Sequence, residues 1–141
     1  MSFKQIAHLL VVTCTISAPF SAHGLTAVKP LAGYKCMSLN LEVLNATQEE
    51  LRSGAGLPPV YAGPSDKSAR LGTNAYVVIV ASPVKEVNGF VEILRLNGQQ
   101  AWISEKVLKP YVNANGSAGT CVPSKMSDGG IGFEFGRTST K

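Results

Sequence analysis

Between residues 57 and 111 the sequence alternates short apolar runs with turn-forming dipeptides, and this alternation restricts the fold more than any other feature. The dipeptides are Gly63-Pro64, Asn88-Gly89 and Asn97-Gly98. Asparagine followed by glycine favours the tight turn that joins two antiparallel strands. The stretch therefore predicts an all-β fold, a small barrel that occupies residues 57–112.

The apolar runs give the expected strands of this barrel. They cover residues 60–61, 76–81, 90–96, 100–103 and 109–112. The run 76–81 is rich in β-branched residues and predicts a buried strand. Residues 62–68 and 82–88 are polar and contain proline, so we expect them to be loops. A single helical turn is expected over residues 104–108, just before the closing strand.

Residues 25–56 form an N-terminal arm with one expected strand and one short helix. Met37, Leu39 and Leu41 alternate with polar residues, which indicates a half-buried strand. Thr47 and Glu50 have the spacing of a capping box, which predicts a short helix that begins there and places Leu51 against the barrel.

Residues 1–24 have the pattern of a secretory signal peptide. Lys4 precedes the apolar run 6–16, which is too short to span a bilayer, and Ala22-His23-Gly24 fits a cleavage site. We therefore expect an exported protein, periplasmic or extracellular, with no membrane span after cleavage. An uncleaved N-terminal anchor and a lipidated Cys14 are the alternatives.

Cleavage after Gly24 would remove both histidines, His8 and His23. A chain without histidine has neither a Ser-His-Asp nor a Cys-His pair, nor a histidine zinc site. The carboxylates Asp66, Glu92 and Glu105 show no spacing that pairs them for glycoside hydrolysis. We therefore expect no catalytic residue, no metal and no cofactor.

Two cysteines remain after cleavage, Cys36 and Cys121. In an exported chain such a pair predicts one disulfide, here joining the arms on either side of the barrel. Two free buried thiols or a redox pair are the alternatives, although the Cys-x-x-Cys spacing of redox pairs is absent.

Residues 113–141 differ in composition from the barrel stretch. Residues 113–119 are rich in Asn, Gly and Ser and predict a connector, followed by a C-terminal tail. Phe133-Glu134-Phe135 is the apolar feature of this tail and is expected to fold back onto the barrel. We expect at least the last five residues to be disordered.

The spaced set of motifs resembles the bacterial SH3-like (SH3b) domain, a small barrel of exported proteins. The motifs are Val60-Tyr61-Ala62-Gly63-Pro64-Ser65, Leu71-Gly72, Asn88-Gly89-Phe90-Val91-Glu92-Ile93, Asn97-Gly98-Gln99-Gln100-Ala101-Trp102-Ile103 and Leu108. Tyr61, Phe90 and Ala101 stand where arginine, tryptophan and glycine are usual in that family. The resemblance implies a domain that recognises cell-wall peptides or glycans, or that docks partner domains.

Four aromatic residues are the candidates for a ligand-binding face: Tyr61, Phe90, Trp102 and Tyr111. Rigid aromatic rings provide contact area at a small cost in entropy. The resemblance implies that much of the Trp102 ring is packed in the core instead, whereas core and exposed positions are both open for the two tyrosines. Asp66 and Lys67 are expected at a solvated loop tip.

The expected function is a non-catalytic binding or docking module of the cell envelope, acting as a monomer. Its partner would be a cell-wall polymer or an envelope protein. The alternative is a small envelope protein that inhibits or assists a partner enzyme, with a cell-wall hydrolase as a weaker alternative. The net charge is +4, but the basic residues are scattered singly, which argues against nucleic acid as a partner.

Overall fold

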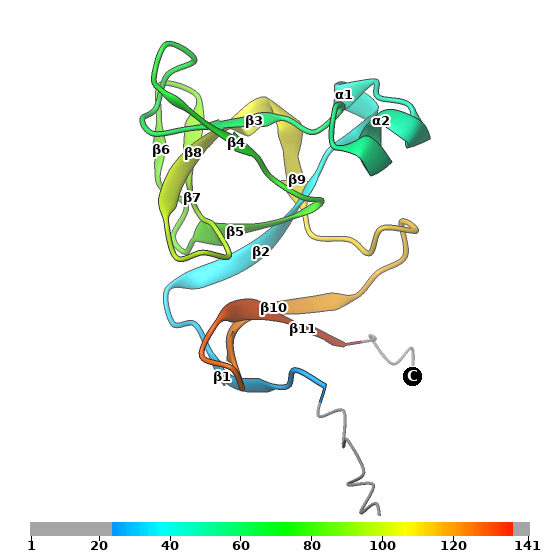
Figure 1. Ribbon diagram of the computed structural model, residues 1–141, viewed down its shortest axis with the longest axis vertical. Helices are drawn as coiled ribbons and strands as arrows, with labels where there is room; N and C mark the ends of the chain where they lie inside the picture. Colours follow the sequence, from blue (N-terminus) through cyan, green and yellow to red (C-terminus); the bar gives the residue numbers. More distant parts are fainter. Residues whose placement is uncertain (1–23, 137–141) are drawn as a thin grey trace, which may run out of the picture.

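A computed structural model describes residues 24–136, which form two antiparallel sheets and two short helices (Figure 1). The all-β class expected from the sequence is confirmed. The expected signal peptide up to residue 23, with both histidines and Cys14, lies outside the described residues, as do the last five residues.

The larger sheet contains most of residues 57–112, the stretch that was expected to form a barrel. Its strands follow the order β4-β3-β8-β7-β5-β2-β9, and the short β6 pairs with β7. The bounds are β2 (Tyr34–Leu39), β3 (Pro59–Tyr61), β4 (Arg70–Thr73), β5 (Val77–Ala81), β6 (Glu86–Val87), β7 (Phe90–Leu94), β8 (Gln100–Ser104) and β9 (Leu108–Pro110). Asn88-Gly89 joins β6 to β7 and Asn97-Gly98 joins β7 to β8, and all but Asn97 have a positive φ.

This sheet curves strongly around one apolar core (Figure 1). Alternate residues of each strand point inward, as the two-residue period of a strand requires. The fully or nearly fully buried members are Leu39, Val60, Val78, Val80, Val91, Ile93, Ala101 and Ile103.

The expected barrel is an open, curved sheet and not a closed one. Within residues 24–136 no pairing joins β4 to β9, the two end strands. Strand β9 is three residues long and ends at Pro110, which has no backbone N–H to extend a ladder. Strand β3 pairs with β8 through one residue pair, Tyr61 with Trp102.

Two helices, α1 (Leu41–Leu44) and α2 (Gln48–Ser53), lie between β2 and β3. The predicted capping box of α2 is confirmed, because the Glu50 N–H donates to Thr47 Oγ1 at 3.2 Å and the Thr47 N–H donates to Glu50 Oε2 at 2.8 Å. The hydrogen bond from the Thr47 N–H, together with the one from its hydroxyl, lowers the pKa of Glu50. The expected strand ends at Leu39, so Leu41 packs on the core from a helix that the sequence did not predict.

A second sheet of three strands lies against the first (Figure 1). It consists of β1 (Ala27–Pro30), β10 (Thr120–Met126) and β11 (Ile131–Gly136), in the order β1-β10-β11. The region expected to be a connector and tail therefore contains a hairpin. Its turn is closed by the Met126 N–H donating to the Gly130 carbonyl at 2.9 Å. The connector itself is folded around Asn113, whose side chain donates to Ser117 and Ala118.

The predicted disulfide is confirmed and joins the two sheets. Cys36 on β2 bonds to Cys121 on β10, with their Cα atoms 5.9 Å apart. Two residues further along β2, the fully buried Ser38 lies on the same face. Its hydroxyl donates to the Val112 carbonyl at 3.0 Å and accepts from the Val112 N–H at 3.1 Å.

Replacing Ser38 by alanine is expected to lower the free energy of unfolding by about 1–3 kcal/mol. The change leaves the Val112 N–H without its hydrogen-bond partner. Urea denaturation measures the effect, with the exposed Ser53→Ala as the matched control, since the Ser53 hydroxyl is not buried. Equal midpoints for the two variants would show that the Ser38 hydrogen bonds do not hold the connector.

Candidate functional site

Three of the four aromatic candidates lie on the outer face of the larger sheet. Tyr61 on β3 and Trp102 on β8 occupy paired positions, and the rings of Tyr61 and Phe90 meet edge to face with centroids 5.9 Å apart. All three side chains are half-buried. The expected core position of Trp102 is wrong, because its neighbours Ala101 and Ile103 take the inward positions of β8.

Lys85 covers the ring of Trp102. Its Nζ lies 5.5 Å from the ring centroid and 2.6 Å from Glu92 Oε2, and Glu92 is paired with Trp102 across β7 and β8. The Lys85 side chain is 57% exposed and that of Glu92 is 14% exposed. The indole is thus less available to a ligand than the other two rings.

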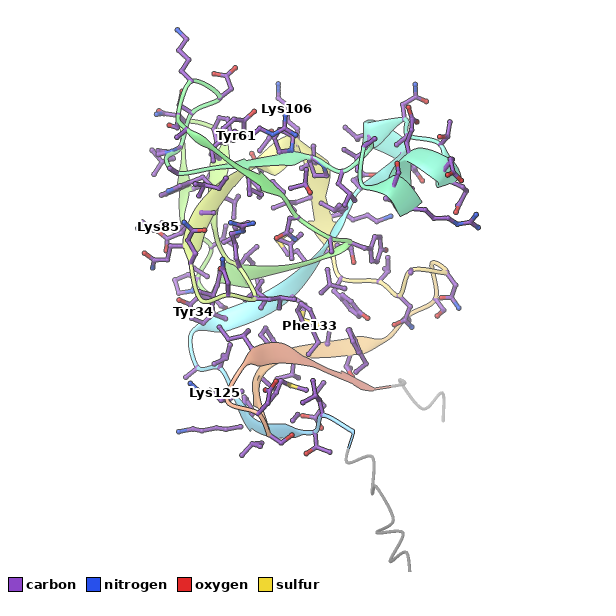
Figure 2. All side chains as sticks on the ribbon, in the orientation of Figure 1. Tyr34, Tyr61, Lys85, Lys106, Lys125 and Phe133 are labelled. Atoms are coloured by element: carbon purple, nitrogen blue, oxygen red, sulfur yellow. A yellow bond between two sulfur atoms is a disulfide. The ribbon has the colours of Figure 1, made fainter. Side chains whose placement is uncertain are left out.

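A groove of about 350 Å³ runs beside Tyr61 and Phe90. Its remaining lining residues are Pro58, Pro59, Asp66, Asn88, Gly89, Ser104, Lys106 and Val107. Asp66 comes from the loop 62–68, and Asn88 comes from the turn that joins β6 to β7. Figure 2 shows Tyr61 and Lys106 at the same end of the larger sheet. We call this feature the tyrosine groove.

Tyr111 is separate from this group. Its ring stacks on Phe135 of β11 with centroids 6.3 Å apart, and its hydroxyl donates to Asn113 Oδ1 at 2.9 Å. Removal from water raises the pKa of the Tyr111 hydroxyl, and the nearby Tyr76 adds to the increase. The four candidates therefore do not form one site.

The three candidate carboxylates also lie apart. Asp66 lines the tyrosine groove, Glu92 is paired with Lys85, and Glu105 lines a third depression beside Lys109. Among the residues that the structure describes, no three His, Cys, Asp or Glu side chains are grouped so that they could hold a metal ion. Within that same part of the chain, no helix has the length and apolar character needed to cross a membrane.

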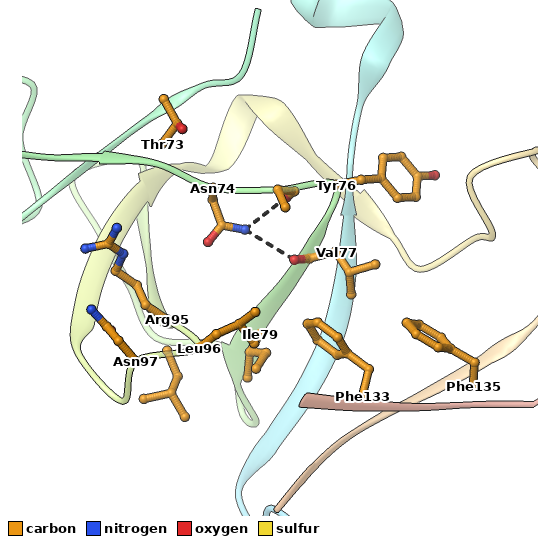
Figure 3. Close-up of a pocket in the computed structure, with 12 residues that line it drawn as sticks. Thr73, Asn74, Tyr76, Val77, Ile79, Arg95, Leu96, Asn97, Phe133 and Phe135 are labelled. Carbon is orange, nitrogen blue, oxygen red and sulfur yellow. Dashed lines mark hydrogen bonds between the residues drawn. The ribbon is translucent and has the colours of Figure 1, made fainter. Parts of the chain in front are cut away.

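A larger groove of about 470 Å³ lies between the larger sheet and strand β11 of the smaller sheet (Figure 3). Its apolar lining comes from Val77 and Ile79 of β5, the turn after β7, and Phe133 and Phe135 of β11. We call it the inter-sheet groove. The sequence did not predict it, although Phe133-Glu134-Phe135 was the signal that the C-terminal segment folds back.

Comparison of the chain with protein-family models, with curated proteins and with solved structures gives no significant match. The function is therefore inferred from the geometry and chemistry of the two grooves.

Proposed function

We propose that this protein is an exported, non-catalytic module of the cell envelope that binds a peptide or glycan of the cell wall in the tyrosine groove. The main support for the proposal is that the rings of Tyr61 and Phe90 line one groove together with Pro58 and Pro59. Aromatic rings and prolines lose little conformational freedom when a ligand covers them.

The charges of the groove are suited to such a ligand. Asp66 and Lys106 supply one charge of each sign to its lining. Short cell-wall peptides carry both amino and carboxylate groups, and complementary charges fix the orientation of a ligand more than they add affinity.

Two further features support the proposal. The Asn97-Gly98 turn between β7 and β8 and the helical turn η1 (Glu105–Val107) before β9 are compatible with the SH3-like resemblance, on which the proposal also draws. The disulfide is compatible with a non-cytoplasmic protein, since disulfides persist in oxidising compartments.

Tyr61→Ala is expected to abolish most of the retention of the purified protein on insoluble cell-wall sacculi. Loss of a central aromatic contact costs about 2 kcal/mol or more, or roughly 30-fold in affinity. Co-sedimentation at low and at moderate salt measures retention, and Tyr111→Ala is the matched control because Tyr111 lies outside the groove.

The salt dependence separates recognition from charge attraction. Retention that survives moderate salt and is lost in Tyr61→Ala supports the proposal. Retention that disappears with salt reflects only the attraction of a basic protein to an anionic polymer. No retention at either salt would contradict the proposal and point to a protein partner.

A further inference from the structure

Strand β11 has an open edge. It ends the smaller sheet, and within residues 24–136 no hydrogen bond joins its outer side to another segment. Pro123 on β10 is paired with Phe133 on β11. The Pro123 carbonyl points away from β11, toward the β1 side, where it accepts from the Leu31 N–H at 2.8 Å. Phe133 is therefore in a non-hydrogen-bonded pair, so its own N–H and carbonyl point to the open edge.

The same alternation applies along the whole strand. The backbone N–H and carbonyl groups of Ile131 and Phe135 point the same way as those of Phe133. Strand β11 thus has three residues with free backbone groups at its open edge. The opposite edge of this sheet is protected, because β1 ends with Lys29 and Pro30. In the larger sheet, β9 is protected in the same way by Lys109 and Pro110. Strand β11 contains neither lysine nor proline.

The side chains of two of these edge residues, Phe133 and Phe135, line the inter-sheet groove. Figure 3 shows the rings of Phe133 and Phe135 rising from β11 toward the larger sheet. At the groove, Phe135 is 56% exposed and Leu96 is 54% exposed. An exposed apolar surface of this kind, beside a free strand edge, is typical of an interaction site.

Arg95 gives the groove its charge. Among the described residues it is the only charged one that lines the groove, and its Nη1 donates to Gln99 Oε1 at 2.8 Å. No carboxylate of the described residues lies within ion-pair distance of it. A guanidinium beside an apolar surface is suited to a carboxylate on an apolar partner.

We propose that an extended segment of a partner protein adds as a strand to the open edge of β11. Its backbone pairs with Ile131, Phe133 and Phe135, alternate apolar side chains enter the inter-sheet groove, and an acidic side chain reaches Arg95. Strand addition gives affinity through the backbone and specificity through pockets for alternate side chains. This site is separate from the tyrosine groove and does not depend on the function proposed for that groove.

The probe is a phage-displayed library of random twelve-residue peptides, selected on the full-length protein. We expect the selected peptides to share apolar residues at alternate positions and one acidic residue. Binding of a synthesised peptide of this kind should slow hydrogen exchange at the backbone N–H groups of Phe133 and Phe135. These groups have no hydrogen-bond partner among residues 24–136 of the free protein and would be paired in the complex.

Two pairs of variants test the geometry. Arg95→Glu is expected to weaken binding about tenfold or more, and a peptide in which the acidic residue is replaced by lysine should regain affinity for this variant alone. Ile131→Pro removes a free N–H at the edge and should weaken binding, whereas Ile131→Ala keeps that N–H and serves as its control. Thermal melting checks that each variant is folded.

Three results would overturn the proposal. One is a selection that yields no peptide with the alternating apolar and acidic pattern. Another is a selected peptide whose affinity falls in Tyr61→Ala but not in Arg95→Glu, which would assign it to the tyrosine groove. The third is a dimer in sedimentation that Ile131→Pro dissociates, since a second copy would then occupy the edge.

Discussion

Replacing Cys36 and Cys121 together by serine is expected to lower the free energy of unfolding by about 4–5 kcal/mol. The bridge closes a loop with a sequence separation of 85, and the entropy of the unfolded chain rises when so long a loop is opened. The effect is large relative to the total stability of a domain of this size. Urea denaturation of the variant and the wild type measures it.

Reduced wild-type protein is the control for this prediction. It should match the double variant, because both lack the same covalent link. Intact mass before and after reduction and alkylation verifies that one bridge was present. An unchanged midpoint in the double variant would mean that hydrogen bonds such as those of Ser38 hold the two sheets together without the bridge.

Ile93→Ala is expected to lower the free energy of unfolding by about 2–5 kcal/mol. Ile93 on β7 is 1% exposed and lies between Val80 on β5 and Ala101 on β8. The alanine at position 101 is too short to fill the cavity that the substitution leaves. Chemical denaturation monitored by circular dichroism measures the loss.

Leu96→Ala is the matched control for the core substitution. Leu96 is also aliphatic but is 54% exposed, so the change should stay within about 0.5 kcal/mol. If both variants lost the same stability, the position of Ile93 in the core would be assigned incorrectly.

The sequence predicted the features that depend on local chemistry. Asn88-Gly89 and Asn97-Gly98 determine turns through their own backbone preferences, and Thr47 with Glu50 determines the start of α2. The disulfide followed from the count of cysteines. The strand expected over residues 90–96 is present as β7 over residues 90–94.

The features that depend on distant partners were not predicted. Strands β1 and β10 contain proline and lysine and gain their pairing from each other, across most of the chain. Trp102 was expected inside because the SH3-like resemblance implies a buried ring there, but in β8 it is Ala101 and Ile103 that face the core. The inter-sheet groove forms because β11 returns to face β5 and the turn after β7 across it.

The pairing of β1 with β10 has a consequence for the order in which the protein folds. When the chain is made or exported with its N-terminus first, β1 appears early. Its partner β10 appears only after nearly all of the described chain. Contacts so distant in sequence form slowly. Among the described residues, Cys36 likewise has no cysteine with which to form a disulfide until Cys121 has emerged. Oxidation of this pair thus marks a late step of maturation, and a truncated product would be left with a free thiol.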